Sequence, residues 1–279
     1  MRAQNLTVSI PVLKERCDKN CPYCISLMTP EVKPNWDLML RNARKVQELA
    51  WAAKVTSVLL TSKGEPFLNY EQLTIMATHF LRFPLEVQTN GVRLKRMFLE
   101  DASSLNRLSG EFGVNVVAIS MDKLADIMTY GALMRELKMQ GIVTRVCMNV
   151  TSLFGASSFA AAMSAAQSCG FVDQILFRRI GRPEICWGPE GLRTKNWIED
   201  NDAGDKYDAL KTGLKNCRRK KLIRTSAFGN EVWAVGSIAV MFSDYCLQEE
   251  SHEENIRSLV FKEDGHVYTN WSSEASVLF

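Results

Sequence analysis

Residues 6–12 read LTVSIPV, and after four more residues the chain continues with CDKNCPYC at residues 17–24. The first stretch alternates apolar and polar side chains, which is typical of a β-strand. The second stretch places three cysteines in the loop after that strand, and an amphipathic helix follows. Strand, loop and helix follow one another in this order, and the chain then repeats the order, so we take it as the first structural unit of the fold.

The first 180 residues repeat this unit six times. The predicted strands are residues 6–12, 55–61, 85–89, 114–121, 142–150 and 172–180. The segments between them carry apolar residues at helical spacing, as in the helix that Asn35 caps and that ends near residue 53. The alternation predicts an α/β fold, a partial (β/α)6 TIM-like barrel with parallel strands. Such barrels carry their functional groups at the C-terminal ends of the strands.

The pattern changes after residue 180, where we expect a small mixed C-terminal extension. Residues 181–205 predict a loop, residues 206–220 predict a helix that ends in the basic run CRRKK at 217–221, and short antiparallel strands follow. Asp264 and Gly265 predict the turn of a β-hairpin. Since no flexible linker separates the parts, we expect a barrel core at residues 1–180. The extension at residues 181–279 should pack on it and cover the substrate site.

Composition narrows the class of protein. The 279 residues are 46% hydrophobic, with 34 Lys and Arg against 31 Asp and Glu, so a sizeable core is expected and a strongly cationic nucleic-acid coat is excluded. No apolar run approaches the roughly 18 residues of a membrane helix. The chain also starts without an apolar signal segment. We therefore expect a cytoplasmic chain with no membrane partner.

Cysteine spacing points to a metal. Of eight cysteines, Cys17, Cys21 and Cys24 lie within eight residues, whereas the other five are scattered. Three thiolates are one short of the four that close a tetrahedral zinc site or fully ligate a four-iron cluster. The residues alone leave three interpretations open: an iron cluster with a vacant position, a zinc site completed by a distant residue, and reduced thiols that merely cluster.

The spacing CxxxCxΦC, with Tyr23 as the aromatic residue, resembles the radical S-adenosylmethionine (radical SAM) superfamily over about residues 6–180. The resemblance implies that Cys17, Cys21 and Cys24 hold a 4Fe-4S cluster whose fourth iron chelates S-adenosylmethionine, with Tyr23 against the adenine. It also implies reductive cleavage to a 5′-deoxyadenosyl radical that abstracts hydrogen from a substrate. An electron donor such as flavodoxin or ferredoxin follows from the same resemblance.

Other strand ends extend the resemblance. The turn Lys63-Gly64-Glu65-Pro66 is similar to the Gly-Gly-Glu-Pro turn of that family, with Lys63 in place of the first glycine. The residues implied for cofactor binding share positions at strand ends, and they are Gly64, Glu65, Pro66, Asn90, Ser120, Asp122 and Asn149, with Tyr23 from the loop. A simple helix-start turn at residues 64–66 and a helix N-cap at Asp122 are the structural alternatives.

Three residues are candidates for contact with the substrate. Arg178 and Arg179 end the sixth strand on alternating sides, so one should point into the cavity toward an anionic substrate, and a solvated pair is the alternative. Cys246, in the extension, is a candidate hydrogen-atom donor. The other four scattered cysteines are expected to be core thiols. We expect a small polar or anionic substrate, such as a nucleoside or nucleotide derivative.

The sequence is also compatible with two functions other than radical chemistry on a small molecule. Radical SAM modification of RNA or a peptide is one, and its support is the basic run at 217–221 with Trp233 and Tyr245 nearby in the sequence. A non-catalytic iron-sulfur or zinc binding protein is the other.

Overall fold

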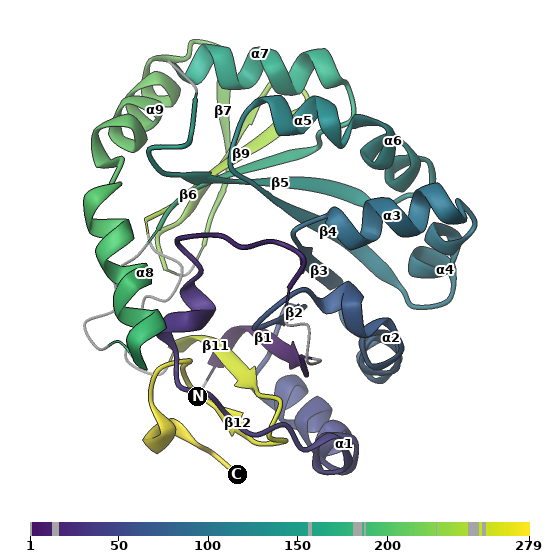
Figure 1. Ribbon diagram of the computed structural model, residues 1–279. Helices are drawn as coiled ribbons and strands as arrows, with labels where there is room; N and C mark the ends of the chain where they lie inside the picture. Colours follow the sequence, from purple (N-terminus) through teal and green to yellow (C-terminus); the bar gives the residue numbers. More distant parts are fainter. Residues whose placement is uncertain are drawn as a thin grey trace.

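A mostly parallel, curved sheet forms the centre of the computed structural model, which describes residues 2–12, 17–155, 158–180, 186, 188–226, 228–244, 251–252 and 255–279 (Figure 1). Within these ranges the sheet has twelve strands in the order β10-β11-β1-β2-β3-β4-β5-β6-β9-β8-β7, and β12 pairs with β11. The strands are β1 (Arg2–Ile10), β2 (Ser57–Ser62), β3 (Leu85–Thr89), β4 (Val114–Met121), β5 (Val143–Val150), β6 (Gln174–Arg179), β7 (Lys220–Thr225), β8 (Glu231–Val235), β9 (Ile238–Ser243), β10 (Ser251–His252), β11 (Asn255–Phe261) and β12 (Val267–Tyr268).

Helices cover the outer face of the curved sheet (Figure 1). They are α1 (Trp36–Ala52), α2 (Tyr70–His79), α3 (Val92–Glu100), α4 (Ser104–Gly110), α5 (Ala125–Thr129), α6 (Gly131–Met139), α7 (Phe159–Cys169), α8 (Gly188–Asp200) and α9 (Gly204–Asn216), with short 3-10 turns η1 (Ile25–Met28), η2 (Pro66–Asn69) and η3 (Glu274–Ser276). Strands β1 to β6 are neighbours in sequence order and run parallel. The α/β class and the barrel-like sheet predicted from the sequence are therefore confirmed.

Side-chain alternation separates the outer core from the inner face. Leu6, Val8 and Ile10 of β1 are fully buried in the hydrophobic core. Their neighbours Asn5 and Thr7 point to the other side and line an interior cavity. Helices bury only the outer face of the sheet, so apolar and polar side chains alternate along these parallel strands. Parallel strands that are covered on both faces usually have continuous runs of apolar residues.

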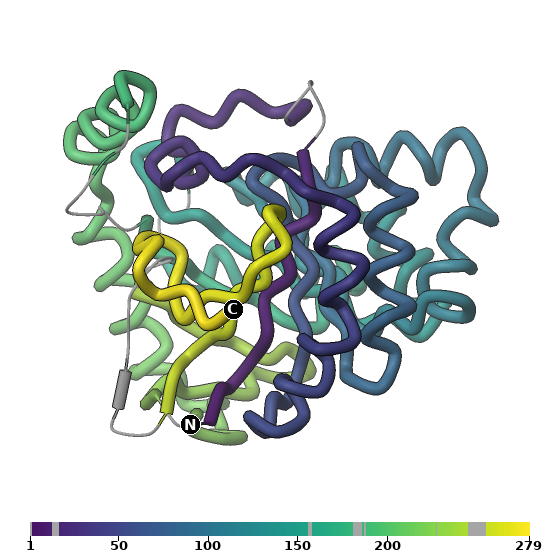
Figure 2. The backbone as a smooth tube through the Cα atoms, turned by 90° about the horizontal axis from the view of Figure 1, so that it is seen from below, coloured from purple at the N-terminus to yellow at the C-terminus, as the bar shows by residue number. Residues whose placement is uncertain are grey.

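The C-terminal extension joins the sheet at both of its ends. Strand β9 pairs in parallel with β6, and β11 pairs in parallel with β1, so that chain ends far apart in sequence lie side by side (Figure 2). The expected antiparallel strands are present as well, in the β7-β8-β9 meander and in the hairpin of β11 and β12. The sequence did not indicate the two parallel pairings, because each joins segments with no local signal for the other.

Two expectations about the extension were wrong. Residues 181–205 are not a loop throughout, because α8 occupies Gly188–Asp200 and buries Gly191, Thr194 and Ile198. Its packing, and not its composition, stabilises this helix. The basic run at 217–221 is not a helix end, since α9 stops at Asn216 and the run falls on a turn and the start of β7.

The concave face of the sheet encloses a cavity of about 580 Å³. Its wall includes Ile25, Ser26 and Thr29 from the segment around η1, which directly follows the cysteine loop, but none of residues 17–24. Among the residues that the structure describes, no helix has both the length and the hydropathy needed to cross a bilayer.

Candidate functional site

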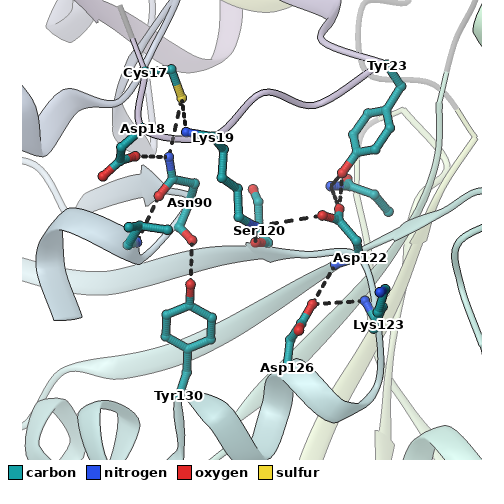
Figure 3. A network of polar contacts seen from close by, with 12 residues as sticks. Cys17, Asp18, Lys19, Tyr23, Asn90, Ser120, Asp122, Lys123, Asp126 and Tyr130 are labelled. Carbon is teal, nitrogen blue, oxygen red and sulfur yellow. Dashed lines mark hydrogen bonds and ion pairs between the residues drawn. The ribbon is translucent and has the colours of Figure 1, made fainter. Parts of the chain in front are cut away.

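The cysteine loop lies over the C-terminal ends of β3, β4 and β5, as Figure 3 shows through its contacts. Cys17, Cys21 and Cys24 are free thiols, the first exposed and the other two half-buried. The Cys24 N–H donates to the Cys21 carbonyl (3.1 Å), and the Leu27 N–H donates to the Cys24 carbonyl (3.0 Å). This turn brings the second and third cysteines close together in the chain's path before η1 begins.

Asn90, which follows β3, holds the first part of the loop (Figure 3). Its Nδ2 donates to Asp18 Oδ1 (2.8 Å) and to Cys17 Sγ (3.4 Å). Its Oδ1 accepts from the Val92 N–H (2.8 Å), and its carbonyl accepts from the Tyr130 hydroxyl (3.3 Å). The side chain at this strand end is therefore fixed from both sides, and it presents its amide to the first cysteine.

Asp122, which follows β4, holds the second part of the loop (Figure 3). Its Oδ1 accepts hydrogen bonds from the Tyr23 hydroxyl and from Asn149 Nδ2, the latter at 3.4 Å. Its Oδ2 lies 3.7 Å from Lys19 Nζ, which also donates to the Ser120 carbonyl (3.5 Å). Asp122 does not cap a helix, because α5 begins at Ala125 and is preceded by Leu124.

Two sequence-predicted site residues, Tyr23 and Asn149, therefore contact the carboxylate of a third, Asp122, and Ser120 is linked to it through Lys19. Tyr23 and Asn149 are each 6% exposed, and Asp122 and Ser120 are partly buried. Tyr23 also packs against Trp197 of α8, with 5.7 Å between ring centroids, in a small apolar cluster with Met28, Ile180 and Ile198. Helix α8 thus covers the cysteine loop from outside.

The turn after β2 connects two strand ends. Glu65 is 3% exposed, and its carboxylate accepts from the Thr89 hydroxyl (2.6 Å), the Asn90 N–H (2.8 Å) and the Phe67 N–H (3.2 Å). Burial raises the pKa of Glu65 to about 7, and these three hydrogen bonds oppose the rise. Glu65 therefore fixes Asn90 relative to β2.

Gly64 and Pro66 flank Glu65 in the same turn. The Gly64 N–H donates to the Ser62 Oγ (3.1 Å), and Pro66 is buried as the first residue of η2. Proline suits this position because the first turn of a helix needs no N–H donor there. Lys63, which replaces the first glycine of the resembled motif, is buried and donates from Nζ to the Pro30 carbonyl.

Burial and nearby negative charge raise the pKa of two of the loop thiols, Cys17 and Cys21. Burial raises the pKa of Cys21 to about 11, and the Asp122 carboxylate adds to the rise, whereas Lys19 lowers it. Burial also raises the pKa of Cys17, against the hydrogen bonds from Lys19 and Asn90. A bound cation would reverse this balance, because thiolates are the form that coordinates metal.

The donor set of the cysteine loop consists of three thiols, a ligand type of both iron-sulfur clusters and zinc sites. Three thiols share one loop, and the charges of Cys17 and Cys24 both act on Cys21. In the described part of the chain, no three His, Cys, Asp or Glu side chains converge as a metal site, and the three loop cysteines are included in this finding. The residues thus have the chemistry that either metal centre requires, and the three sulfurs would have to move closer together to share one.

The two arginines at the end of β6 lie on opposite sides, as alternation predicts. Arg178 lines the cavity, and Gln88 of β3, with its amide oxygen turned toward the guanidinium, accepts from Arg178 at 2.8 and 3.3 Å. Arg179 forms an ion pair with Asp202 (2.8 Å) and is not among the cavity residues. Of these two arginines, Arg178 is the one whose side chain can contact a molecule in the cavity.

Sequence reasoning missed a second set of polar residues inside the barrel. Arg145 of β5 pairs with Glu86 of β3 and donates from Nε to Gln174 of β6 (2.7 Å). Charged residues at alternate positions of strands that are otherwise apolar were the available signal, since in a closed sheet only the inner face can hold them. Lys19 was also missed, although its place between two of the cysteines could have indicated it.

The remaining cysteines divide into three groups. Cys147 and Cys169 are buried, as expected of core thiols, and Cys217 is half-buried against the main core. Cys186 was expected in the core but packs beside Cys21 in the apolar cluster under α8. Cys246, the candidate hydrogen-atom donor, lies outside the described residues.

Comparison with solved structures finds proteins with a similar architecture. Three crystal structures of SuiB from Streptococcus suis share it: SuiB bound to precursor peptide SuiA, SuiB alone, and SuiB bound to S-adenosylmethionine. Their TM-scores are 0.54, 0.54 and 0.52, at 12 to 13% sequence identity over 96% of this chain. The chain spans 59 to 60% of the length of these SuiB chains. No protein-family model and no curated protein matches the sequence. The chain thus shares the fold of these SuiB structures.

Proposed function

We propose that this chain is a radical SAM enzyme that acts on a small polar or anionic substrate. The observation that carries the proposal is the loop of Cys17, Cys21 and Cys24, which is tied to the strand ends by Asn90 and Asp122. Three cysteines in a loop over the C-terminal ends of a barrel sheet are positioned where this fold class carries its chemistry.

In this proposal the three cysteines hold a 4Fe-4S cluster. The residues that would contact S-adenosylmethionine are those gathered at the strand ends: Tyr23, Gly64, Glu65, Pro66, Asn90, Ser120, Asp122 and Asn149. When bound, the cluster and S-adenosylmethionine would supply a 5′-deoxyadenosyl radical for hydrogen abstraction, with electrons from a donor such as flavodoxin or ferredoxin.

The chain's own contribution is to orient the loop and exclude water. Lys19 and Tyr23 anchor the loop on Asp122, while Trp197 of α8 covers it from outside. A covered site protects a reactive species from solvent. The reducing conditions of the cytoplasm would keep the loop thiols free for cluster assembly.

The cavity supports an anionic substrate. Five described cavity residues are cationic and two are acidic; the cations are Lys63, Arg145, Arg178, Arg224 and Arg257, and the acids are Glu86 and Glu231. An excess of positive charge in a recessed space raises the local concentration of anions. The volume of about 580 Å³ is in the range of small-molecule sites. Residues from the extension, including Arg224 and Trp271, form part of the wall, which supports a role for residues 181–279 in covering the substrate.

Anaerobic reconstitution tests the cluster. Cys17→Ala, Cys21→Ala and Cys24→Ala should each lower the iron content and abolish formation of 5′-deoxyadenosine from S-adenosylmethionine under reduction. Cys217→Ala, which lies outside the loop, is the matched control and should keep both. One zinc per chain without iron, or a spectrum of the reduced protein that S-adenosylmethionine does not change, would instead favour a non-catalytic metal-binding protein.

Deuterated substrates test the substrate class. Nucleotides and other anionic metabolites carrying deuterium should transfer the label to 5′-deoxyadenosine, and Arg178→Gln should lower transfer by raising KM. No transfer from any anionic candidate would remove this part of the proposal.

A peptide substrate is the second candidate. SuiB, which shares the fold, has been crystallised with a precursor peptide. RNA is the related possibility, because Arg218, Arg219 and Lys221 are exposed on the turn and the start of β7. RNA binding should weaken steeply with salt as counterions are released, and peptide binding should depend on salt much less.

A further inference from the structure

We propose that Lys63 is a positioning residue whose side chain anchors one end of the return segment of the cysteine loop, residues 30–35, while the backbone of Glu263 anchors the other end. This segment connects η1 with α1 and so determines where the third cysteine lies. The inference rests on the proposed function only for what the loop does. The anchoring itself follows from hydrogen bonds and burial.

Lys63 anchors the first end of the return segment. It directly follows β2, is 6% exposed, and donates from Nζ to the carbonyl of Pro30. The resembled motif has a glycine at this position, which has no side chain that could make such a bond. A buried lysine needs a polar partner close to its ammonium group, and here that partner is the backbone just beyond the cysteine loop.

Glu263 anchors the second end. It follows β11, is 2% exposed, and its carbonyl accepts from the Asn35 N–H (2.8 Å). Asn35 is the N-cap of α1, where its side chain accepts from the Leu38 N–H (3.1 Å). Two residues further on, the Gly265 carbonyl accepts from Asn42 Nδ2 (2.8 Å). The turn after β11 is therefore fixed on the first turns of α1.

The sheet brings the two anchors together. Ser62 of β2 pairs with Ile10 of β1, and Phe261 of β11 pairs with Val8 of β1, so Lys63 and Glu263 follow the two strands that flank β1, at the C-terminal ends of these parallel strands. Burial raises the pKa of Glu263, and the charge of Lys63 opposes that rise. The C-terminal extension and strand β2 thus each hold one end of the return segment, Glu263 at Asn35 and Lys63 at Pro30.

Thiol alkylation of the iron-free protein tests the anchoring residue by residue. In Lys63→Met, alkylation of Cys24 should accelerate about tenfold or more, because the return segment opens locally. Cys17 should change less, since Asn90 holds it independently. The buried thiols Cys147 and Cys169 report on the whole fold and should stay protected. Lys63→Arg keeps a cationic donor and should restore slow alkylation of Cys24.

A second variant separates positioning from general stability. Lys63→Met/Glu263→Gln removes one buried charge of each sign and keeps the backbone carbonyl at residue 263, but it still lacks the bond to Pro30, so alkylation of Cys24 should remain fast while Cys147 stays protected. Alkylation of Cys24 at the wild-type rate in either variant, with Cys147 protected, would overturn the proposal. Loss of Cys147 protection in the double variant would overturn it too, because the pair would then hold the whole fold and not the loop.

The outcome is distinct from that of the proposed function. Alkylation is measured without iron, so a chain that never assembles a cluster would still show the effect of Lys63→Met. Conversely, unchanged iron content in Cys17→Ala would remove the radical SAM proposal and leave the anchoring intact.

Discussion

A single carboxylate, that of Asp122, organises the cysteine loop at the level of individual residues. One of its oxygens accepts hydrogen bonds from the Tyr23 hydroxyl and the Asn149 amide, and the other forms an ion pair with Lys19. Hydrogen bonds to a charged acceptor are stronger than those between neutral groups, and a partly buried carboxylate that lost them would be costly. The loop is therefore held by a few polar contacts together with the apolar cluster around Tyr23.

Removing the Tyr23 hydroxyl tests this arrangement. Tyr23→Phe keeps the ring against Trp197 but leaves Asp122 and Asn149 without that partner, so the free energy of unfolding should fall by about 1–3 kcal/mol in urea denaturation. Tyr70→Phe is the matched control, because the Tyr70 hydroxyl is buried without a hydrogen-bond partner. That variant should be neutral or slightly stabilised. Equal losses in the two variants would contradict a specific role for Tyr23.

The carboxyl group of Glu65 predicts a pH dependence. Its pKa is raised from 4.5 to about 7, so between these values the folded chain binds more protons than the unfolded one. The resulting contribution to stability is complete below pH 4.5 and is lost as the pH rises through 7, by about 3 kcal/mol in total.

Urea denaturation of Glu65→Gln against pH measures this effect. The wild type should lose stability relative to the variant between pH 5 and 7. Glu71→Gln, at an exposed position of α2, controls for the loss of one charge and should run parallel to the wild type. If the free energy of unfolding depended on pH in the same way in Glu65→Gln and in the wild type, the pKa of Glu65 would be the same in the folded and unfolded chain, which would contradict the prediction.

At the level of elements, helix α8 packs against the segment that follows the cysteine loop. It packs on η1 through Gly191, where a Cβ would lie 2.8 Å from the Leu27 carbonyl oxygen. That contact is with backbone, which cannot move aside as a flexible side chain can. Close approach of the helix therefore requires glycine at this position.

Gly191→Ala should separate α8 from η1. We expect a loss of about 1–3 kcal/mol in the free energy of unfolding, together with faster alkylation of Cys21. Gly110→Ala, at a helical position of α4 with nothing within 4 Å, is the control. It should be neutral or stabilise by up to about 1 kcal/mol, since alanine has the higher helix propensity. An unchanged Cys21 rate in Gly191→Ala would mean that α8 does not cover the loop.

Strand β7 gives the basic run a structural role of its own. It is an edge of the sheet in the described part of the chain, with Leu222 and Ile223 exposed. Lys220, Lys221 and a register shift before Arg224 make this edge a poor template for another strand. Charges and bulges commonly protect edge strands in this way. The run can serve this purpose whether or not RNA binds it.

For the whole molecule, the important feature is that barrel core and extension share one sheet. Strand β11 completes the edge at β1, and Leu259 of β11 and Leu6 of β1 are partners and fully buried. A continuous sheet and core of this kind favour cooperative unfolding.

Leu259→Ala tests that cooperativity. The cavity left in the core should lower the free energy of unfolding by about 2–5 kcal/mol. Circular dichroism and tryptophan fluorescence should report the same single transition. Leu222→Ala, on the exposed side of β7, should stay within about 0.5 kcal/mol of the wild type. Two separate transitions, only one of them shifted, would show that the extension unfolds independently.

The sequence was informative wherever a local pattern decided the structure. The six strand-helix units, the hairpin at Asp264 and Gly265, and the loop of three cysteines all depend on neighbours within a few residues. Alternation also predicted that Arg178 and Arg179 would face opposite sides, as they do.

The remaining features depend on contacts between distant segments. Helix α8 begins with Gly188 and Pro189, which suggested a loop, and only its packing on η1 makes it a helix. The parallel pairing of β11 with β1 and the meeting of Tyr23 with Asp122 join residues that no local pattern connects. Fold class and cysteine loop were thus predictable, whereas the anchoring of the loop was not.

The pairing of β1 with β11 has a consequence for biosynthesis. The first strand leaves the ribosome early, yet its partner on one side is made some 250 residues later. At typical elongation rates of about 5–20 residues per second, one edge of β1 waits tens of seconds for completion. Pairing at this edge of β1 should therefore be completed only after residues 255–261 have been synthesised, and a chaperone that shields an open strand edge would aid folding in the cell.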